Sequence, residues 1–224
     1  MTTPTTKPTA MVLGIDTATD VRAGLARDGV PLVSDAVGDR RAHAEQLLPL
    51  VQRVLAAAGA TPSDLTAIVV GVGPGPFTGL RVGVVAALTL GEALGIDVRG
   101  VCSLDAIALD WARRGAPERF AVVADARRKE VYWATYAADG TRLSGPSVSA
   151  PIEVPALPLA GPGAPLAGEC TGPAELDAGL LAAAAGQLPD AGHEPLYLRR
   201  PDAEVPTTRK STLLVPRLAR MEKS

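Results

Sequence analysis

The sequence predicts an α/β protein with a mixed sheet and helices packed on its faces, and three observations lead to this fold class. Apolar runs and amphipathic segments alternate in the order β-β-β-α-β-α-β-α through the first half of the chain. The strand and turn pattern of the start returns from residue 120 onward, which indicates two related lobes. The composition is globular, with 47% hydrophobic and 21% charged residues among 224.

The first three elements are predicted to be strands of a meander. Met11–Asp16 is a short apolar run, and Val21–Arg27 alternates less regularly between apolar and polar residues. The dipeptide Asp28-Gly29 is a strong hairpin signal, and it precedes a third strand at Val30–Ala36. This order predicts a three-stranded antiparallel start to the sheet.

Two helices and two further strands are expected next. Apolar residues between 44 and 58 fall at helical spacing and give a first helix with one apolar face. The apolar run 67–72 is typical of a strand buried on both faces, and a Gly/Pro-rich loop separates it from a second helix at about 78–94. A strand at 97–102 and a helix at 104–114 complete the first half of the chain.

A second copy of the opening pattern is visible further along. Phe120–Asp125 and Glu130–Ala137 are strand candidates that end in Asp139-Gly140. They follow the plan of the start: strand, terminal Asp, polar turn, strand, Asp-Gly. Duplication explains this similarity, but chance does too, since Asp at strand ends and Asp-Gly turns are common.

The remaining segments are harder to interpret. Between 141 and 191 the chain is rich in Ala, Pro and Gly, and only one helix is predicted there, at 174–188. Residues 1–10 and 201–224 are expected to be tails. We therefore predict an N-terminal lobe over 11–103 and a reduced C-terminal lobe over 104–200.

Charge and composition exclude several classes of function. The formal net charge of −2 does not by itself indicate binding to a long polyanion, which needs a concentrated basic face. The two cysteines, Cys102 and Cys170, are far apart, and the only histidines, His43 and His193, lack the spacing of a zinc site. No secretory signal is visible at the start, so a cytoplasmic protein is expected.

Insertion into a membrane is not expected either. The longest nearly apolar run, 82–90, lies between Arg81 and Glu92 and is shorter than the roughly 20 residues that cross a bilayer.

The loop of residues 73–79, GPGPFTG, has two interpretations. A glycine-rich turn before a helix is a common anion site, but this loop has neither the Lys-Ser/Thr pair of a Walker loop nor the G-x-G-x-x-G spacing. Pro74 and Pro76 also remove two N–H donors that a phosphate cradle would use. A rigid turn that sets the direction of the next helix is the favoured interpretation.

The second predicted helix carries a row of small residues, Gly79, Gly83, Ala87 and Gly91, spaced four apart. The helix is apolar nearly all round, and such helices are normally covered on more than one side. Its own sheet covers one side only. The other side is covered either by the first helix or by a second protein chain, and a partner interface is slightly favoured.

Carboxylates at strand ends are the remaining candidates for chemistry. Asp16 and Asp125 stand where metal-binding or general-base carboxylates often lie, although an Asp that caps its own turn is the commoner arrangement. His43 is expected to have a surface or capping role. No Ser-His-Asp or Cys-His set is evident in the sequence.

Several segments together resemble one protein family, that of TsaB, also called YeaZ. The similarity is dense up to Ala137 and extends loosely to about residue 200. The motifs that carry it are GIDT at 14–17, RAHAEQLLP at 41–49, GPGPFTGLRVG at 73–83, SLDA at 103–106, DARRKEVY at 125–132 and PLYLR at 195–199.

The resemblance implies an actin-like ATPase fold of two RNase H-like lobes, the second one reduced. It also implies a non-catalytic subunit that forms a homodimer or a heterodimer with TsaD through its first two helices. That complex, with the ATPase TsaE, adds threonylcarbamoyl to the adenosine beside the anticodon of certain tRNAs. No cofactor or metal is expected for this chain, because the complex uses the ATP.

The residues expected at the partner interface lie on the first two helices. A vestigial nucleotide site is expected at Asp16, Thr17 and Asp125. The alternatives are an active actin-like ATPase or small-molecule kinase and, as a weaker candidate, a peptidase. The expected interface residues are Leu47, Leu48, Val51, Phe77, Gly79, Leu80, Gly83, Val84, Ala87 and Gly91.

Overall fold

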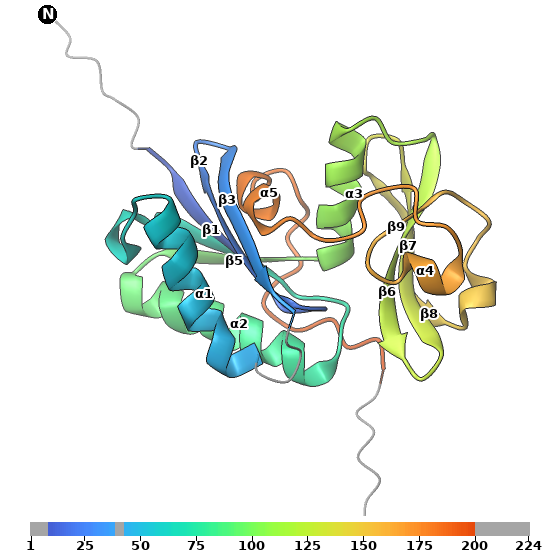
Figure 1. The fold of residues 1–224 in the computed structure, drawn as a ribbon, viewed down its shortest axis with the longest axis horizontal. Helices are drawn as coiled ribbons and strands as arrows, with labels where there is room; N and C mark the ends of the chain where they lie inside the picture. Colours follow the sequence, from blue (N-terminus) through green and yellow to red (C-terminus); the bar gives the residue numbers. More distant parts are fainter. Residues whose placement is uncertain (1–8, 39–42, 200–224) are drawn as a thin grey trace, which may run out of the picture.

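The computed structural model describes residues 9–38 and 43–199, which form two sheets with helices around and between them (Figure 1). Of the predicted tails, 201–224 and all but Thr9 and Ala10 of 1–10 lie outside the described residues, as does the side chain of His43.

The first sheet has five strands in the order β3-β2-β1-β4-β5. The antiparallel meander consists of β1 (Met11–Asp16), β2 (Val21–Arg27) and β3 (Val30–Val37). The strands β4 (Ala67–Gly71) and β5 (Asp97–Val101) are parallel to β1. These bounds match the predicted strands to within one residue, because each strand is marked by an apolar run and a turn.

Helices α1 (His43–Ala57) and α2 (Phe77–Leu94) pack on one face of this sheet (Figure 1). Their apolar sides and the sheet enclose a core in which Leu13, Ile15 and Leu50 are fully buried. Helix α2 ends as predicted at Gly95, whose φ of 65° is the left-handed conformation that glycine adopts without strain.

The second sheet has four strands in the order β8-β7-β6-β9. Strands β6 (Arg119–Arg127), β7 (Glu130–Ala137) and β8 (Arg142–Ser149) repeat the antiparallel meander, and β9 (Leu159–Ala160) pairs with β6 in parallel, as β4 does with β1. This repetition confirms the predicted internal similarity. The whole is the actin-like ATPase fold, with a reduced second half in which the short helix α4 (Ala164–Ala167) follows β9.

Two helices lie between the sheets (Figure 1): α3 (Ser103–Arg113), and α5 (Ala178–Ala183), which is much shorter than the helix predicted at 174–188. Helix α5 packs on β1 and β2 of the first sheet, although it follows the second sheet in sequence. The cross-strand pair Gly14 and Gly24 lets its backbone approach, because a Cβ on either glycine would overlap α5. One core of buried residues therefore joins both sheets through α3 and α5. The lobe boundary at residue 103 stays a prediction.

Helix α2 is also long and apolar enough, by length and composition, to cross a membrane. It packs against β4 and β5, and 33% of it is buried inside the fold.

Candidate functional site

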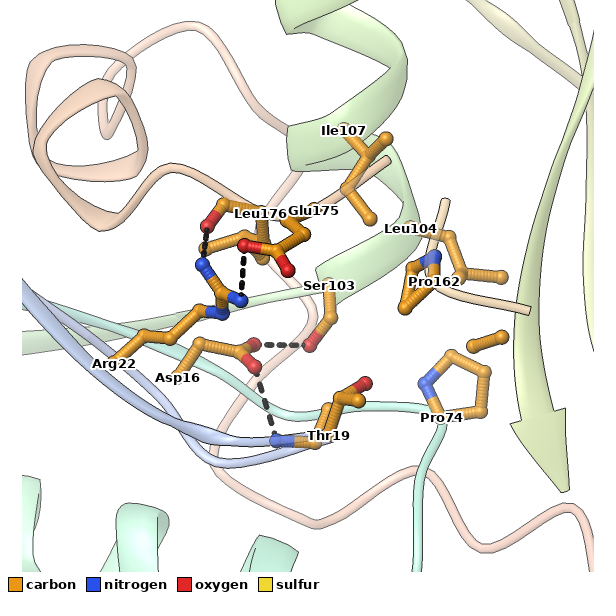
Figure 2. Close-up of a pocket in the computed structure, with 12 residues that line it drawn as sticks. Asp16, Thr19, Arg22, Pro74, Ser103, Leu104, Ile107, Pro162, Glu175 and Leu176 are labelled. Atoms are coloured by element: carbon orange, nitrogen blue, oxygen red, sulfur yellow. Dashed lines mark hydrogen bonds and ion pairs between the residues drawn. The ribbon is translucent and has the colours of Figure 1, made fainter. Parts of the chain in front are cut away.

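A small cavity lies between the two halves of the molecule, where the sequence analysis places a vestigial nucleotide site (Figure 2). Asp16 at the end of β1 and Ser103 at the start of α3 line one side of it. Ala124 of β6 and the loop residues Pro162 and Leu176 line the side that belongs to the second half.

The carboxylate of Asp16 is fully engaged inside the protein. Its Oδ1 accepts a hydrogen bond from the Ala18 amide at 2.9 Å, and its Oδ2 accepts one from the Ser103 hydroxyl at 2.5 Å. Only 2% of the residue is exposed, and this burial raises the pKa of Asp16, while the hydrogen bonds from Ser103 and Ala18 oppose the rise. Asp16 therefore caps its own turn, as the commoner interpretation holds.

The cavity itself is too small for a nucleotide. Space for the centre of a water molecule amounts to about 20 Å³, which is room for about one water. Ligand pockets usually measure roughly 300–1,000 Å³.

An ion pair closes this cavity on one side. Arg22 of β2 donates to Glu175 Oε2 at 2.6 Å and to the Leu176 carbonyl at 3.0 Å, as Figure 2 shows. These contacts tie the first sheet to the segment that precedes α5. The sequence analysis missed Arg22 and Glu175, because nothing in the local pattern links residues 153 positions apart.

Of the three residues of the predicted nucleotide site, only Asp16 lines this cavity, and the nucleotide site stays a prediction. Thr17 turns toward α2 and donates to the Gly79 carbonyl at 2.8 Å. Asp125 does not line the cavity; its Oδ1 accepts from the Arg127 amide at 2.7 Å, and its Oδ2 pairs with the Arg127 guanidinium at 3.1 Å. Asp125 therefore also caps its own turn.

The GPGPFTG loop is a rigid connection, as the sequence favours. The Gly73 amide donates to the Ser103 hydroxyl at 3.2 Å, and the Gly73 carbonyl accepts from the Ser103 amide at 2.8 Å. These bonds fix the loop to the start of α3. Among the described residues, no three His, Cys, Asp or Glu side chains lie close enough to hold a metal ion.

Most of the predicted interface residues on α1 and α2 are buried by the chain itself, and the interface stays a prediction. The small-residue row faces the chain's own fold: a Cβ on Gly83 would overlap Thr17, and one on Gly91 would overlap Val98. Small residues here permit close packing of α2 on the sheet. Eight of the ten predicted residues are buried in this way, namely Leu47, Val51, Gly79, Leu80, Gly83, Val84, Ala87 and Gly91.

Four large apolar residues of the two helices remain exposed. Leu48 on α1 is 50% exposed, and Val85 on α2 is 60% exposed. Phe77 and Leu88 on α2 are exposed as well, so Leu48 and Phe77 are the predicted interface residues that a partner could reach. We call Leu48, Phe77, Val85 and Leu88 the apolar face.

Comparisons with known proteins give the family. The model of the TsaD family, described as tRNA N6-adenosine threonylcarbamoyltransferase, matches residues 39–172, more than half of the chain. An uncharacterized protein of Mycobacterium tuberculosis is 50% identical over 203 residues, which are 86% of this chain and 93% of the relative. The Escherichia coli protein TsaB is 37% identical over 130 residues, 57% of this chain and 55% of its own length.

Solved structures agree with this result. YeaZ from Pseudomonas aeruginosa superimposes with a TM-score of 0.67 and 28% identity, over 84% of this chain and all of that one. A second structure, described as similar to the peptidase YeaZ from Pseudomonas aeruginosa, gives 0.66 and 30%, over 86% of this chain and all of that one. The motifs, the repeated meander and these matches together show that the chain belongs to the TsaB (YeaZ) family.

Proposed function

We propose that this protein is a non-catalytic subunit of a cytoplasmic complex that adds threonylcarbamoyl to the adenosine beside the anticodon of tRNA. Its Escherichia coli and Bacillus subtilis relatives are named tRNA threonylcarbamoyladenosine biosynthesis protein TsaB. In this role the chain binds a catalytic partner of the TsaD type, and TsaE and tRNA join the assembly.

The observation that carries this proposal is the apolar face. Four large apolar side chains are exposed on two neighbouring helices, and one of them, Val85, is 60% exposed. Clustered apolar side chains on a surface typically mark a site of protein association. Burial against a partner would remove this area from water and stabilise the complex.

The partner is a second copy of this chain or a chain of the TsaD type. The TsaD family model covers residues 39–172, which include both α1 and α2, so a TsaD-type chain would carry the corresponding helices. Either partner can pack its helix pair on this one as a four-helix contact. A stable contact of this kind buries roughly 1,200–2,000 Å² in total.

The closed cavity supports a role without chemistry of its own. Asp16 is held by Ser103 and Ala18, and the space beside it admits about one water molecule. A kinase or ATPase of this fold needs room for a nucleotide next to its carboxylates. Neither Asp16 nor Asp125 is placed to meet one.

The test is to place a charge on the apolar face. Val85→Glu is expected to abolish the dimer in sedimentation and to stop co-purification with a TsaD-type partner, because a carboxylate would be buried in the contact. The melting temperature should hardly change, since Val85 is exposed. Loss of both complexes would assign the face to both partners, and loss of one would identify the partner.

The matched control is Ile152→Glu, which adds the same charge at an apolar residue that is 92% exposed on the second half of the molecule. It should leave every complex intact. An unchanged dimer and an unchanged TsaD-type complex in Val85→Glu would contradict the proposal. ATP turnover by the pure chain that is lost in Asp16→Ala would establish an active enzyme instead.

A further inference from the structure

The hairpin that joins β6 to β7 has an unusual backbone. Arg127 pairs with Glu130, so Arg128 and Lys129 form a two-residue turn. All three cationic residues have positive φ angles, 62° for Arg127, 53° for Arg128 and 62° for Lys129. Residues other than glycine, asparagine and aspartate rarely adopt this conformation, because the Cβ crowds the backbone.

The same chain builds a turn of this kind with the usual residues elsewhere. Between β2 and β3 the turn is Asp28-Gly29, with φ angles of 51° and 78°. Such turns favour Asn-Gly or Asp-Gly. The requirements of a hairpin therefore do not explain Arg128 and Lys129, and strained positions of this kind concentrate at functional sites.

The chain also holds this strained turn in place from the side. Arg199 donates to the Ala126 carbonyl at 3.0 Å and forms an ion pair with Glu130, while Arg127 pairs with Asp125. The two ends of the turn are therefore anchored to Arg199, which lies 73 residues after Ala126 in the chain. The side chains of the turn itself are exposed.

The anchoring segment connects the turn to the beginning of α2 (Figure 1). The Tyr197 ring, two residues before Arg199, stacks on Phe77 with 4.7 Å between the ring centroids. The Arg81 guanidinium lies 4.3 Å from the centroid of the Phe77 ring. We call the resulting surface the cationic ridge; it consists of Arg81, Arg127, Arg128, Lys129 and Arg199, with Tyr197 among them.

The ridge concentrates positive charge in a chain whose net charge is −2. Segments 77–81, 125–130 and 195–199 contain five arginine or lysine residues and two carboxylates, Asp125 and Glu130. Five minus two leaves an excess of three positive charges. The overall charge of the sequence conceals this excess, because the three segments meet only in the fold.

We propose that the cationic ridge binds RNA, with the arginine and lysine side chains on backbone phosphates and the Tyr197 ring offering a face to a base. Clustered cations beside an exposed ring have the chemistry that single-stranded RNA requires. A fixed turn presents its cations without first losing conformational entropy. The identity of the RNA as tRNA rests on the proposed function, whereas the surface itself does not.

The decisive variant is Lys129→Gly, measured with an unmodified tRNA transcript by fluorescence anisotropy at several salt concentrations. We expect the full chain, alone or with a TsaD-type partner, to lose about 3- to 10-fold in affinity, and the slope of log affinity against log salt to become shallower by about one. The melting temperature should rise, because glycine relieves the strain at Lys129. A loss of affinity in a more stable protein cannot be a folding defect.

The matched control is Arg119→Gln, which removes one positive charge at the opposite end of β6 and should leave RNA affinity unchanged. Tyr197→Ser should weaken binding without changing the salt slope, because it removes a ring and no charge. No RNA binding by the wild-type protein in either form, an unchanged affinity in Lys129→Gly, or an equal loss in Arg119→Gln would overturn the inference.

Sedimentation of the same variant separates this inference from the proposed function. Lys129→Gly should keep the dimer and the TsaD-type complex, which Val85→Glu should lose. If Lys129→Gly lost a protein partner while RNA binding stayed normal, the ridge would be a protein contact and the inference would be wrong. Failure of the Val85→Glu test would leave the RNA result standing.

Discussion

Asp16 and Asp125 occupy the same place in the two halves of the molecule and have opposite surroundings. Asp16 is the last residue of β1, Asp125 lies two residues before the end of β6, and each accepts a hydrogen bond from the amide two residues later. Asp16 is 2% exposed and bonds to the Ser103 hydroxyl of α3. The Asp125 side chain is 26% exposed and pairs with Arg127.

The difference shows which properties the two halves share because their strands follow the same order, and which they do not share. The bond from the Asp side chain to the amide two residues later is the same in both halves, because an Asp at that position bonds to its own backbone. The turns themselves differ, since residues 17–20 join β1 to β2 and only Arg128 and Lys129 join β6 to β7. The environment is different, because α3 and the segment before α5 cover the first turn, while the second turn is exposed. The same residue is therefore an interior cap in one half and a surface ion pair in the other.

The largest expected effect tests the buried half at Gly71. A Cβ at this position would overlap Asp16 Oδ2 and crowd the Ser103 hydroxyl. We expect Gly71→Ala to lower the free energy of unfolding by about 2–3 kcal/mol, because both neighbours are buried and hold each other. Urea denaturation measures it, with Gly38→Ala as control, since a Cβ on Gly38 meets nothing within 4 Å. Equal stability of the two variants would show that the Asp16 site adapts freely.

The next effect is a pH dependence at Asp16. Its pKa in the folded state lies above the ordinary 3.8, chiefly because of burial. Above pH 3.8 the unfolded chain releases a proton that the folded protein retains, so this group's contribution to stability falls as the pH rises toward the folded pKa.

Asp16→Asn removes the loss of stability that wild type shows as the pH rises, because an amide stays neutral at every pH. The Ser103 hydroxyl can rotate to accept a hydrogen bond from the amide. The variant should therefore gain stability relative to wild type from pH 4 to pH 8, by an amount on the order of 1 kcal/mol. Unfolding curves of both proteins across this range measure the gain. A difference that shrinks with rising pH would contradict the assignment of burial as the cause.

The smallest effect is expected at the exposed counterpart. Asp125→Ala removes the hydrogen bond to the Arg127 amide and the ion pair with its guanidinium. We expect a loss of about 0.5 kcal/mol in the free energy of unfolding, because a partly exposed pair is weakened by water. Thermal denaturation of Asp125→Ala and Asp16→Ala compares the two losses, and Asp16→Ala should lower the free energy of unfolding clearly more. The reverse order would break the contrast between the two halves.

Strand β8 is an element that the sequence pattern did not predict. Its eight residues, Arg142–Ser149, include Gly145 and Pro146, and no strand was predicted for them. Proline is tolerated there because β8 is an edge strand, so an amide missing from the ladder costs little. Edge position is a property of the finished sheet, and no local pattern reports it.

The same limit of local sequence patterns applies to the interface predicted on helix α2. Its ends and its apolar character were predictable, but apolar residues surround it, so periodicity could not tell its inner face from its outer one. The row of small residues left internal packing and a partner interface open, and in the structure Gly83 packs on Thr17 and Gly91 packs on Val98. Val85 and Leu88 lie on the face that stays exposed.

Local periodicity, turn residues and short motifs were enough to predict the strands of the first sheet, the two long helices, the repeated meander and the family. They did not predict which residues of α2 are exposed, that α5 returns to the first sheet, how little space lies beside Asp16, or that the segments around Arg81, Arg128 and Arg199 meet. These features depend on contacts between residues far apart in the chain, and such contacts leave no local signal.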